Sequence, residues 1–204
     1  MKKRILIVYL HGIGDHLMAT PAIREYKQRH RDTDIYLLAL HHPAYAEIWA
    51  NNPDVKKVLF SSLQKNPRYG NPVFWLRDYW KILADVKHAQ RQYNFSHVYN
   101  VVHFYMPGKI YPHLPFSRYR RHKSEIVAKK LGVTLQQPAY SLDLSQYAKQ
   151  FARQFFVRHR LLGKQVVGFH YTASTQNKSL SSLYAQKVIH ELLAKKRHAL
   201  ILSH

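Results

Sequence analysis

The fold of this chain is decided by its first strand and turn, ILIVYL at residues 5–10 and HGIGDH at residues 11–16. The first stretch is an unbroken run of apolar and β-branched residues, which is typical of a strand covered on both faces in a parallel sheet. Two glycines then interrupt the run, and apolar residues recur at mostly helical spacings from about Leu17 to His30. Pro21 lies early enough in that segment to be tolerated in a first helical turn. The sequence therefore predicts a strand, a glycine turn and a helix.

The same alternation continues along the chain. A second buried-type strand is predicted at residues 35–40, a short helix at 44–50 and a third strand at 55–60. Strands that alternate with helices in this way favour a parallel sheet with helices on both faces. The expected fold class is therefore α/β, with a doubly wound parallel sheet in the N-terminal part of the chain.

More helices and strands are predicted after a polar loop at residues 61–72. Residues 75–93 have the pattern of an amphipathic helix, and the residues that carry this pattern are Leu76, Tyr79, Trp80, Leu83, Val86 and His88. The other elements expected in this region are a strand at 97–104, a basic helix at 118–131 that stops at Gly132, and a helix at 147–162 that stops at Gly163.

After Gly163 the pattern restarts. A strand at 165–170, a helix at 182–196 and a strand at 198–202 form one βαβ unit. A single unit of this kind leaves most of its sheet face uncovered, so we expect the chain to stop inside its second domain. The predicted organisation is a first domain over residues 1–145, a linker helix over 146–163, and the start of an incomplete Rossmann-like second domain over 164–204.

Composition excludes several classes of chemistry. The 204 residues contain no cysteine, which excludes disulfides, thiol nucleophiles and cysteine-ligated metal centres. Lys and Arg outnumber Asp and Glu by 32 to 11, and this formal net charge of +21 favours polyanionic partners such as nucleic acid, an anionic membrane face or a phosphorylated substrate. No apolar run approaches the ~20 residues of a membrane span, and the N-terminal run is too short for a secretory signal. We therefore expect a cytoplasmic protein.

Asp15 is the first candidate functional residue. The turn does not match the dinucleotide fingerprint G-x-G-x-x-G, because Leu17 stands where the third glycine is required. The predicted topology nevertheless places the Asp15 carboxylate at the C-terminal end of a parallel strand, where open α/β sheets bind ligands. An equally good interpretation from the residues alone is that Asp15 is the N-cap of the following helix.

Several ordered segments of the chain resemble one known family. The segments are Gly14-Asp15, ATPAI at 19–23, Asp34-Ile35, NPDVKKV at 52–58, VGFH at 167–170, Ala173-Ser174 and Lys178. In this order they resemble glycosyltransferase family 9, the ADP-heptose:lipopolysaccharide heptosyltransferases, over essentially the whole chain. The chain departs from the family pattern at Tyr9, His11, Tyr171-Thr172 and Leu180, and it ends before the segment of the second domain that contacts the nucleotide sugar.

The resemblance implies a GT-B-like fold, with the acceptor on the first domain and the nucleotide sugar on the second. It implies transfer of a heptose or related sugar from a nucleotide diphosphate, ADP-heptose above all, to a hydroxyl of the lipopolysaccharide core, with inversion and without a metal or other cofactor. Asp15 would be the general base, since an inverting displacement needs a group that takes the proton of the acceptor hydroxyl. Lys178, helped by Thr172 and Ser174, would balance the charge of the departing diphosphate.

Two basic clusters are candidates for holding an anionic lipopolysaccharide core acceptor beside Gly14. One cluster is Lys65 with Arg68, and the other consists of Arg118, Arg120, Arg121 and Lys123. The planar guanidinium of arginine suits phosphates and carboxylates because it donates two hydrogen bonds at once. The alternative for each of these residues, and for Lys178, is an ordinary solvated side chain.

Other functions remain open on the sequence alone. The net charge and the aromatic and basic run FSRYRR at 116–121 also fit a nucleic-acid-binding protein, but no RRM, KH, helix-turn-helix or zinc-finger pattern is present, so no specific nucleic acid is expected.

A chain that lacks part of the donor domain could also be a catalytically inactive remnant. The histidine pairs His41-His42 and His11 with His16 lack a metalloprotease-like spacing, so no metal is expected. Peripheral contact with the anionic inner face of the membrane is compatible with the charge.

Overall fold

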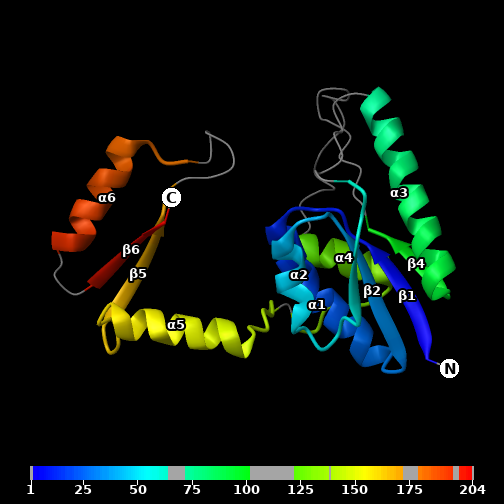
Figure 1. Cartoon of the computed structure of the whole chain (residues 1–204), viewed down its shortest axis with the longest axis horizontal. Coiled ribbons are helices and arrows are strands. Elements are labelled where there is room, and N and C mark those ends of the chain that lie inside the picture. The colour runs from blue at the N-terminus through cyan, green and yellow to red at the C-terminus, as the bar shows by residue number, and fades with distance from the viewer. Residues whose placement is uncertain are drawn as a thin grey trace. The chain divides into compact units, whose positions relative to one another are not determined.

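The computed structural model describes residues 2–63, 72–101, 122–137, 139–171, 179–194 and 198–203. The chain divides into two compact units, Met1–Leu144 and Ser145–His204. Each unit is described by itself below, and Figure 1 shows the elements of both.

The first unit is built on a four-stranded parallel sheet. The strands are β1 (Lys3–Val8), β2 (Thr33–Ala39), β3 (Lys57–Phe60) and β4 (His97–Asn100), in the spatial order β3-β2-β1-β4. Ile5 of β1 is in register with Ile35 of β2 on one side and with His97 of β4 on the other. The predicted α/β class with a parallel sheet is confirmed.

Four helices cover this sheet: α1 (Ile13–Arg29), α2 (Pro43–Ala50), α3 (Pro72–Tyr93) and α4 (Lys123–Leu131). Ile5 and Ile7 pack into a cluster with apolar side chains of α1 and α4, together with Ile48 and Trp49 of α2. The alternate residues of β1, Leu6 and Val8, pack into a second cluster to which α3 contributes. Since successive side chains of a strand point to opposite faces, α3 covers the face opposite to α1 and α4. The central strand β1 is therefore buried on both faces.

The sequence correctly predicted α3 but not which of its faces is buried. Leu76, Trp80 and Leu83 of the predicted stripe are exposed, by 50%, 62% and 38%. The side chains of α3 that enter the core are Ile82 and Ala89, with Tyr93 and one member of the predicted stripe, Val86, beside them. The helix carries two apolar stripes, and the stripe that contains Ile82 and Ala89 lies against the sheet.

The second unit contains α5 (Gln146–Arg158), β5 (Gln165–His170), α6 (Ser182–Ala194) and β6 (His198–Ser203). Its two strands pair in parallel, with Gln165 opposite His198 and His170 opposite Ser203. None of the α5 side chains is buried. The predicted βαβ unit is thus present, whereas the assignment of residues 146–163 as a linker helix stays a prediction.

Helix boundaries differ most from those predicted at three places. Helix α1 begins at Ile13 rather than near Leu17, because Gly12 is its N-cap. Helix α4 begins at Lys123, after the N-cap residue His122, and not at Arg118. Helix α5 ends at Arg158, so that a turn separates it from Gly163, whose φ of 75° lies in the left-handed region.

Candidate functional site

Asp15 lies in the first turn of α1, seven residues after Val8, the last residue of β1. The N-cap of α1 is Gly12, which has no side chain to cap the helix, so the interpretation of Asp15 as the N-cap is wrong. A carboxylate in the first helical turn is stabilised by the positive end of the helix dipole. The hydroxyl of Tyr9 donates a hydrogen bond of 2.9 Å to the backbone carbonyl of Asp15 and so fixes this turn against the end of β1.

The carboxylate of Asp15 faces two nitrogen-bearing side chains. Its Oδ1 forms an ion pair with Nζ of Lys123 at 2.9 Å. Its Oδ2 lies 3.9 Å from Nδ1 of His11, which is longer than a hydrogen bond. The Asp15 side chain is 24% exposed and the Lys123 side chain 25%. One carboxylate oxygen is therefore held by a cation, and the other faces His11 at a distance that leaves it able to accept a further hydrogen bond.

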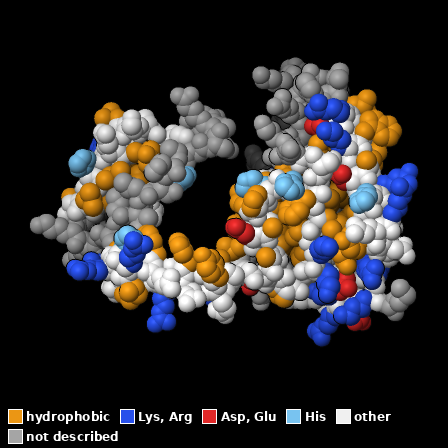
Figure 2. Space-filling view, viewed as in Figure 1, with side chains coloured by type: hydrophobic (Ala, Val, Ile, Leu, Met, Phe, Trp, Pro, Cys, Tyr) orange, Lys and Arg blue, Asp and Glu red, His pale blue; other side chains and the backbone are white. Residues whose placement is uncertain are grey.

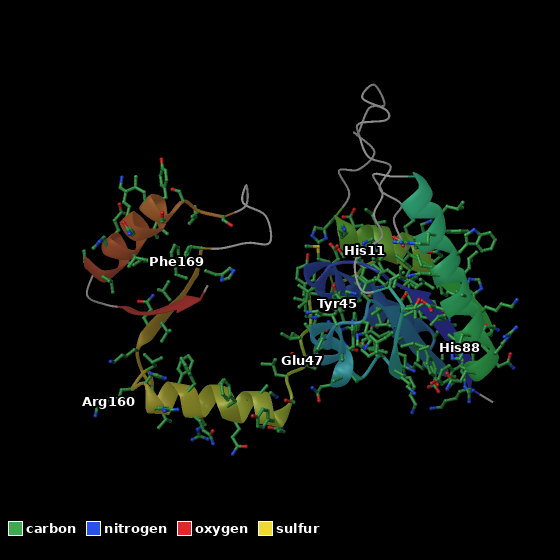
Figure 3. The ribbon with its side chains drawn as sticks, turned by 45° about the horizontal axis from the view of Figure 1, so that its top comes forward. His11, Tyr45, Glu47, His88, Arg160 and Phe169 are labelled. Atoms are coloured by element: carbon green, nitrogen blue, oxygen red, sulfur yellow. The ribbon has the colours of Figure 1, made fainter. Side chains whose placement is uncertain are left out.

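His11 is positioned by the neighbouring strand. Its Nε2 is 3.2 Å from the backbone carbonyl of Val101, so Nε2 carries the hydrogen and donates it there. The other ring nitrogen, Nδ1, faces the Asp15 carboxylate. The ring also packs on Tyr9, with 4.7 Å between the ring centroids. Figure 3 labels His11 and Tyr45, both of which belong to this corner of the first unit.

His16 lies behind Asp15 and is fully buried among aromatic rings. The indole N–H of Trp49 donates a hydrogen bond of 3.0 Å to Nδ1 of His16, and the ring of Tyr45 lies 4.6 Å away between centroids. Nε2 of His16 has no hydrogen-bond partner among the described residues. Burial, with a smaller contribution from His11, lowers the pKa of His16 to about 4. His16 is therefore neutral at neutral pH and supports the turn as a packing residue.

The tyrosines around this corner stay protonated. Burial raises the pKa of Tyr9, and the negative charge of Asp15 raises it further. The same two causes, in the same order, raise the pKa of Tyr45. The Tyr9 hydroxyl is thus a permanent hydrogen-bond donor to the Asp15 backbone.

The structure brings only some of the predicted site residues together. Asp15 and Lys123 are in direct contact, so Lys123, which the sequence placed among the acceptor-binding cations, is a partner of the carboxylate. Gly14 is exposed in the first turn of α1, and a Cβ built on it would meet nothing within 4 Å. The predicted residues that lie outside the described part of the chain are Lys65, Arg68, Arg118, Arg120, Arg121, Thr172, Ser174 and Lys178.

Sequence reasoning missed the supporting residues of this corner. Tyr9, His11 and Val101 position Asp15 or its neighbours through contacts that no local motif announces. Within the described ranges, no group of three or more His, Asp and Glu side chains is placed to hold a metal ion. In the same part of the chain, no helix has the length and apolar content that crossing a bilayer would require.

Comparison with known proteins reveals the fold. No protein-family model and no curated protein matches the chain. Among solved structures, the chain is similar to a glycosyl transferase of family 9 from Veillonella parvula, with a TM-score of 0.70 and 13% identity over 99% of this chain and 63% of the other. It is similar to the heptosyltransferase WaaC of E. coli, in complex with ADP, with a TM-score of 0.58 and 17% identity over 98% of this chain and 66% of WaaC. The chain has a GT-B-like α/β fold.

The chain is also similar to the E. coli ADP-heptose lps heptosyltransferase II, with a TM-score of 0.55 and 12% identity over 98% of this chain and 63% of the other. The chain therefore spans slightly less than two thirds of the length of these structures. The predicted parallel-sheet domain followed by a βαβ unit of a second Rossmann-like domain is confirmed as a fold.

Proposed function

We propose that the chain belongs to glycosyltransferase family 9 and takes part in the transfer of a sugar from a nucleotide-diphosphate sugar to a hydroxyl of an anionic lipopolysaccharide core acceptor. One observation carries the proposal: a partly exposed carboxylate, Asp15, stands at the carboxyl end of the central parallel strand in a GT-B-like fold. Open α/β sheets bind their ligands at this edge. The WaaC structures with ADP and with ADP-2-deoxy-2-fluoro heptose support ADP-heptose as the donor to be tested first.

In the proposed reaction Asp15 is the general base. The hydroxyl oxygen of the acceptor attacks the anomeric carbon and forms the new C–O bond. The bond between that carbon and the diphosphate oxygen breaks, and the nucleoside diphosphate leaves with the electron pair. The hydroxyl proton passes to Oδ2 of Asp15, since Oδ1 is occupied by Lys123. Attack from the side opposite the leaving group inverts the anomeric centre, and no step calls for a metal ion.

Lys123 and Tyr9 act as positioning residues for this base. The ion pair orients the carboxylate so that Oδ2 is presented at the corner, and the Tyr9 hydroxyl holds the backbone of the same turn. In this proposal the donor diphosphate is bound by Thr172, Ser174 and Lys178. The acceptor anions are bound by Lys65, Arg68, Arg118, Arg120 and Arg121, beside Gly14.

The test is a transfer assay with ADP-heptose and a phosphorylated core oligosaccharide, followed by mass spectrometry of the acceptor. Asp15→Asn is expected to lower the rate by about 100- to 10,000-fold, because the amide cannot take the proton. The matched control is Asp34→Asn, which changes a carboxylate at the opposite end of the sheet, next to Arg4 in the register of β1 and β2. Equal rates for wild type and Asp15→Asn would remove Asp15 from the role of base, and a wild type with no transfer would favour the inactive remnant.

A second assay separates this proposal from nucleic-acid binding. The net charge of +21 makes salt-dependent binding to any DNA expected. Phosphorylated core oligosaccharide should displace bound DNA at concentrations where an uncharged oligosaccharide does not. Retention of the DNA in the presence of the phosphorylated core oligosaccharide would favour the nucleic-acid alternative.

A further inference from the structure

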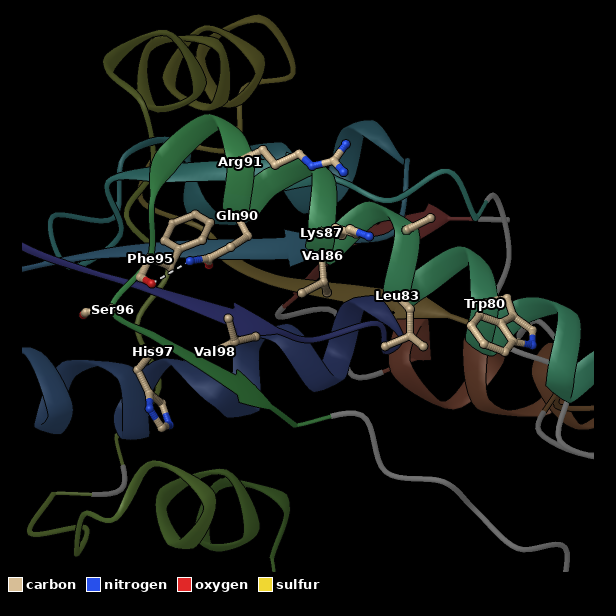
Figure 4. Close-up of a pocket in the computed structure, with 11 residues that line it drawn as sticks. Trp80, Leu83, Val86, Lys87, Gln90, Arg91, Phe95, Ser96, His97 and Val98 are labelled. Atoms are coloured by element: carbon tan, nitrogen blue, oxygen red, sulfur yellow. Dashed lines mark hydrogen bonds between the residues drawn. The ribbon is translucent and has the colours of Figure 1, made fainter.

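A second candidate surface lies on the face of the first unit opposite to α1. It is a groove of about 940 Å³ between α3 and β4, the strand at the edge of the described sheet. Figure 4 shows its lining, with α3 along one side and β4 along the other. The side chain of Gln90 donates a hydrogen bond of 2.8 Å to the carbonyl of Phe95, which ties the end of α3 to the turn before β4. The groove is therefore a formed feature of the fold.

One rim of this groove is apolar and exposed. Leu76, Trp80 and Leu83 are spaced by four and three residues, so they lie on one side of α3. Trp80 is the most exposed of the three, at 62%. Figure 2 shows hydrophobic side chains at the surface over α3, with Lys and Arg beside them. Neighbouring large apolar side chains that are exposed on one side of a helix indicate an interaction surface.

The charges around the groove are all of one sign. The charged residues of the lining are Lys87 and Arg91, and the lining contains no Asp or Glu. The two acidic residues of α3 are directed elsewhere. Asp78 is buried at 6% exposure, and Asp85 accepts hydrogen bonds from the hydroxyls of Ser61 and Ser62. The partner that fits this surface is therefore anionic as well as partly apolar.

We propose that the α3–β4 groove docks the protein on a bilayer surface that contains anionic phospholipid. Trp80, with Leu76 and Leu83, enters the boundary between headgroups and acyl chains, where tryptophan and leucine are favoured. Lys87 and Arg91, one and two further turns along α3, contact the anionic headgroups. A nucleic acid would satisfy the two cations but would leave the three apolar side chains in water, so the bilayer fits the whole surface better. This inference goes beyond the proposed function and does not depend on Asp15.

The experiment measures binding of the full chain to sedimenting vesicles of two compositions. One consists of equal parts phosphatidylethanolamine and phosphatidylglycerol, and the other of phosphatidylcholine alone. Wild type should bind the anionic vesicles, with an affinity that falls as salt is added, and should bind phosphatidylcholine far more weakly. Equal binding to both vesicles, or to neither, would overturn the proposal.

Three variants locate the surface. Trp80→Gln should weaken binding by about tenfold or more, because an aromatic side chain no longer enters the boundary region. The double variant Lys87→Gln, Arg91→Gln should weaken binding to anionic vesicles by about 25-fold, at roughly fivefold for each charge. The matched control is Phe151→Gln on α5, whose side chain is 60% exposed and also stands on a basic helix. It should bind as wild type does.

Two results would show that the α3–β4 groove is not the membrane-binding surface. Loss of vesicle binding in Phe151→Gln but not in Trp80→Gln would place the membrane contact on α5 and overturn the proposal. Tighter binding to duplex DNA than to the anionic vesicles, with the same sensitivity to Trp80→Gln, would assign the groove to nucleic acid. Asp15→Asn should bind vesicles as wild type does, so failure of the proposed catalysis leaves this test unaffected.

Discussion

In the first unit the residues of β1 from Ile5 to Val8 are at most 1% exposed, whereas in the second unit no side chain of α5 is buried. The described hydrophobic side chains buried in the second unit are Leu161 and Ala185. The difference follows from layering, since a sheet covered on both faces encloses a core and a two-stranded sheet with few covering residues does not. Among the described residues, apolar burial is therefore concentrated in the first unit, which carries Asp15.

The largest expected effect is on the free energy of unfolding, and it is measured by comparing one leucine substitution in each unit. Leu6→Ala removes a fully buried side chain of the first unit and should lower its free energy of unfolding by about 2–5 kcal/mol. Leu183→Ala changes a side chain that is 75% exposed in the second unit and should change stability by less than about 0.5 kcal/mol. Urea unfolding followed by far-UV circular dichroism reports on the helices of both units. Equal shifts for the two variants would contradict the comparison.

A second effect concerns pH and the buried histidine. The pKa of His16 is about 4 in the folded chain, against about 6.5 when unfolded, so the unfolded chain binds the proton more readily between these values. The stability of the first unit should therefore be complete above about pH 6.5 and fall as the pH is lowered toward 4, by about 3 kcal/mol in total. Urea titrations across this range measure it.

The matched variants for this pH effect are His16→Phe and His190→Gln. His16→Phe should remove most of the fall, at the cost of the hydrogen bond from Trp49. His190 is exposed in the second unit, so His190→Gln should keep the profile of wild type. A profile for His16→Phe as steep as that of wild type would mean that other groups cause the acid instability.

The smallest of these effects is that of the ion pair at the corner. Lys123→Met removes the cation bound to Asp15 and should cost about 0.5–1 kcal/mol, since both side chains are about one quarter exposed. Lys149→Met, on an exposed position of α5, should change stability by a few tenths of a kcal/mol at most. If the two substitutions cost the same in urea unfolding at low salt, the ion pair does not stabilise the corner.

Sequence patterns predicted the central strand well because its burial on both faces leaves an unbroken apolar run at residues 5–10. They misplaced the start of α1 because Ile13 is exposed and Gly14 is a poor helix former, so the first turn shows no apolar periodicity. Here the N-terminus of the helix is set by the backbone of Gly12 and not by a capping side chain.

The candidate site was only partly predictable for a different reason. Asp15 stands next to its own glycine turn, which is a local signal, whereas Lys123 reaches it only because α4 packs on α1. Likewise the two stripes of α3 look equivalent along the chain, and packing against Leu6 and Val8 decides which of them is buried. Contacts between distant segments are fixed by tertiary packing and leave no mark on local spacing.

Lys123 occupies the first position of α4, at the end of a helix where the backbone dipole repels a positive charge. Its ammonium group is tolerated there because the Asp15 carboxylate lies 2.9 Å away. The two positions are thus bound to change together over evolutionary time: a descendant that lost the acid at 15 would gain by losing the base at 123. Alignments of homologues should show this pairing as covariation between positions 15 and 123.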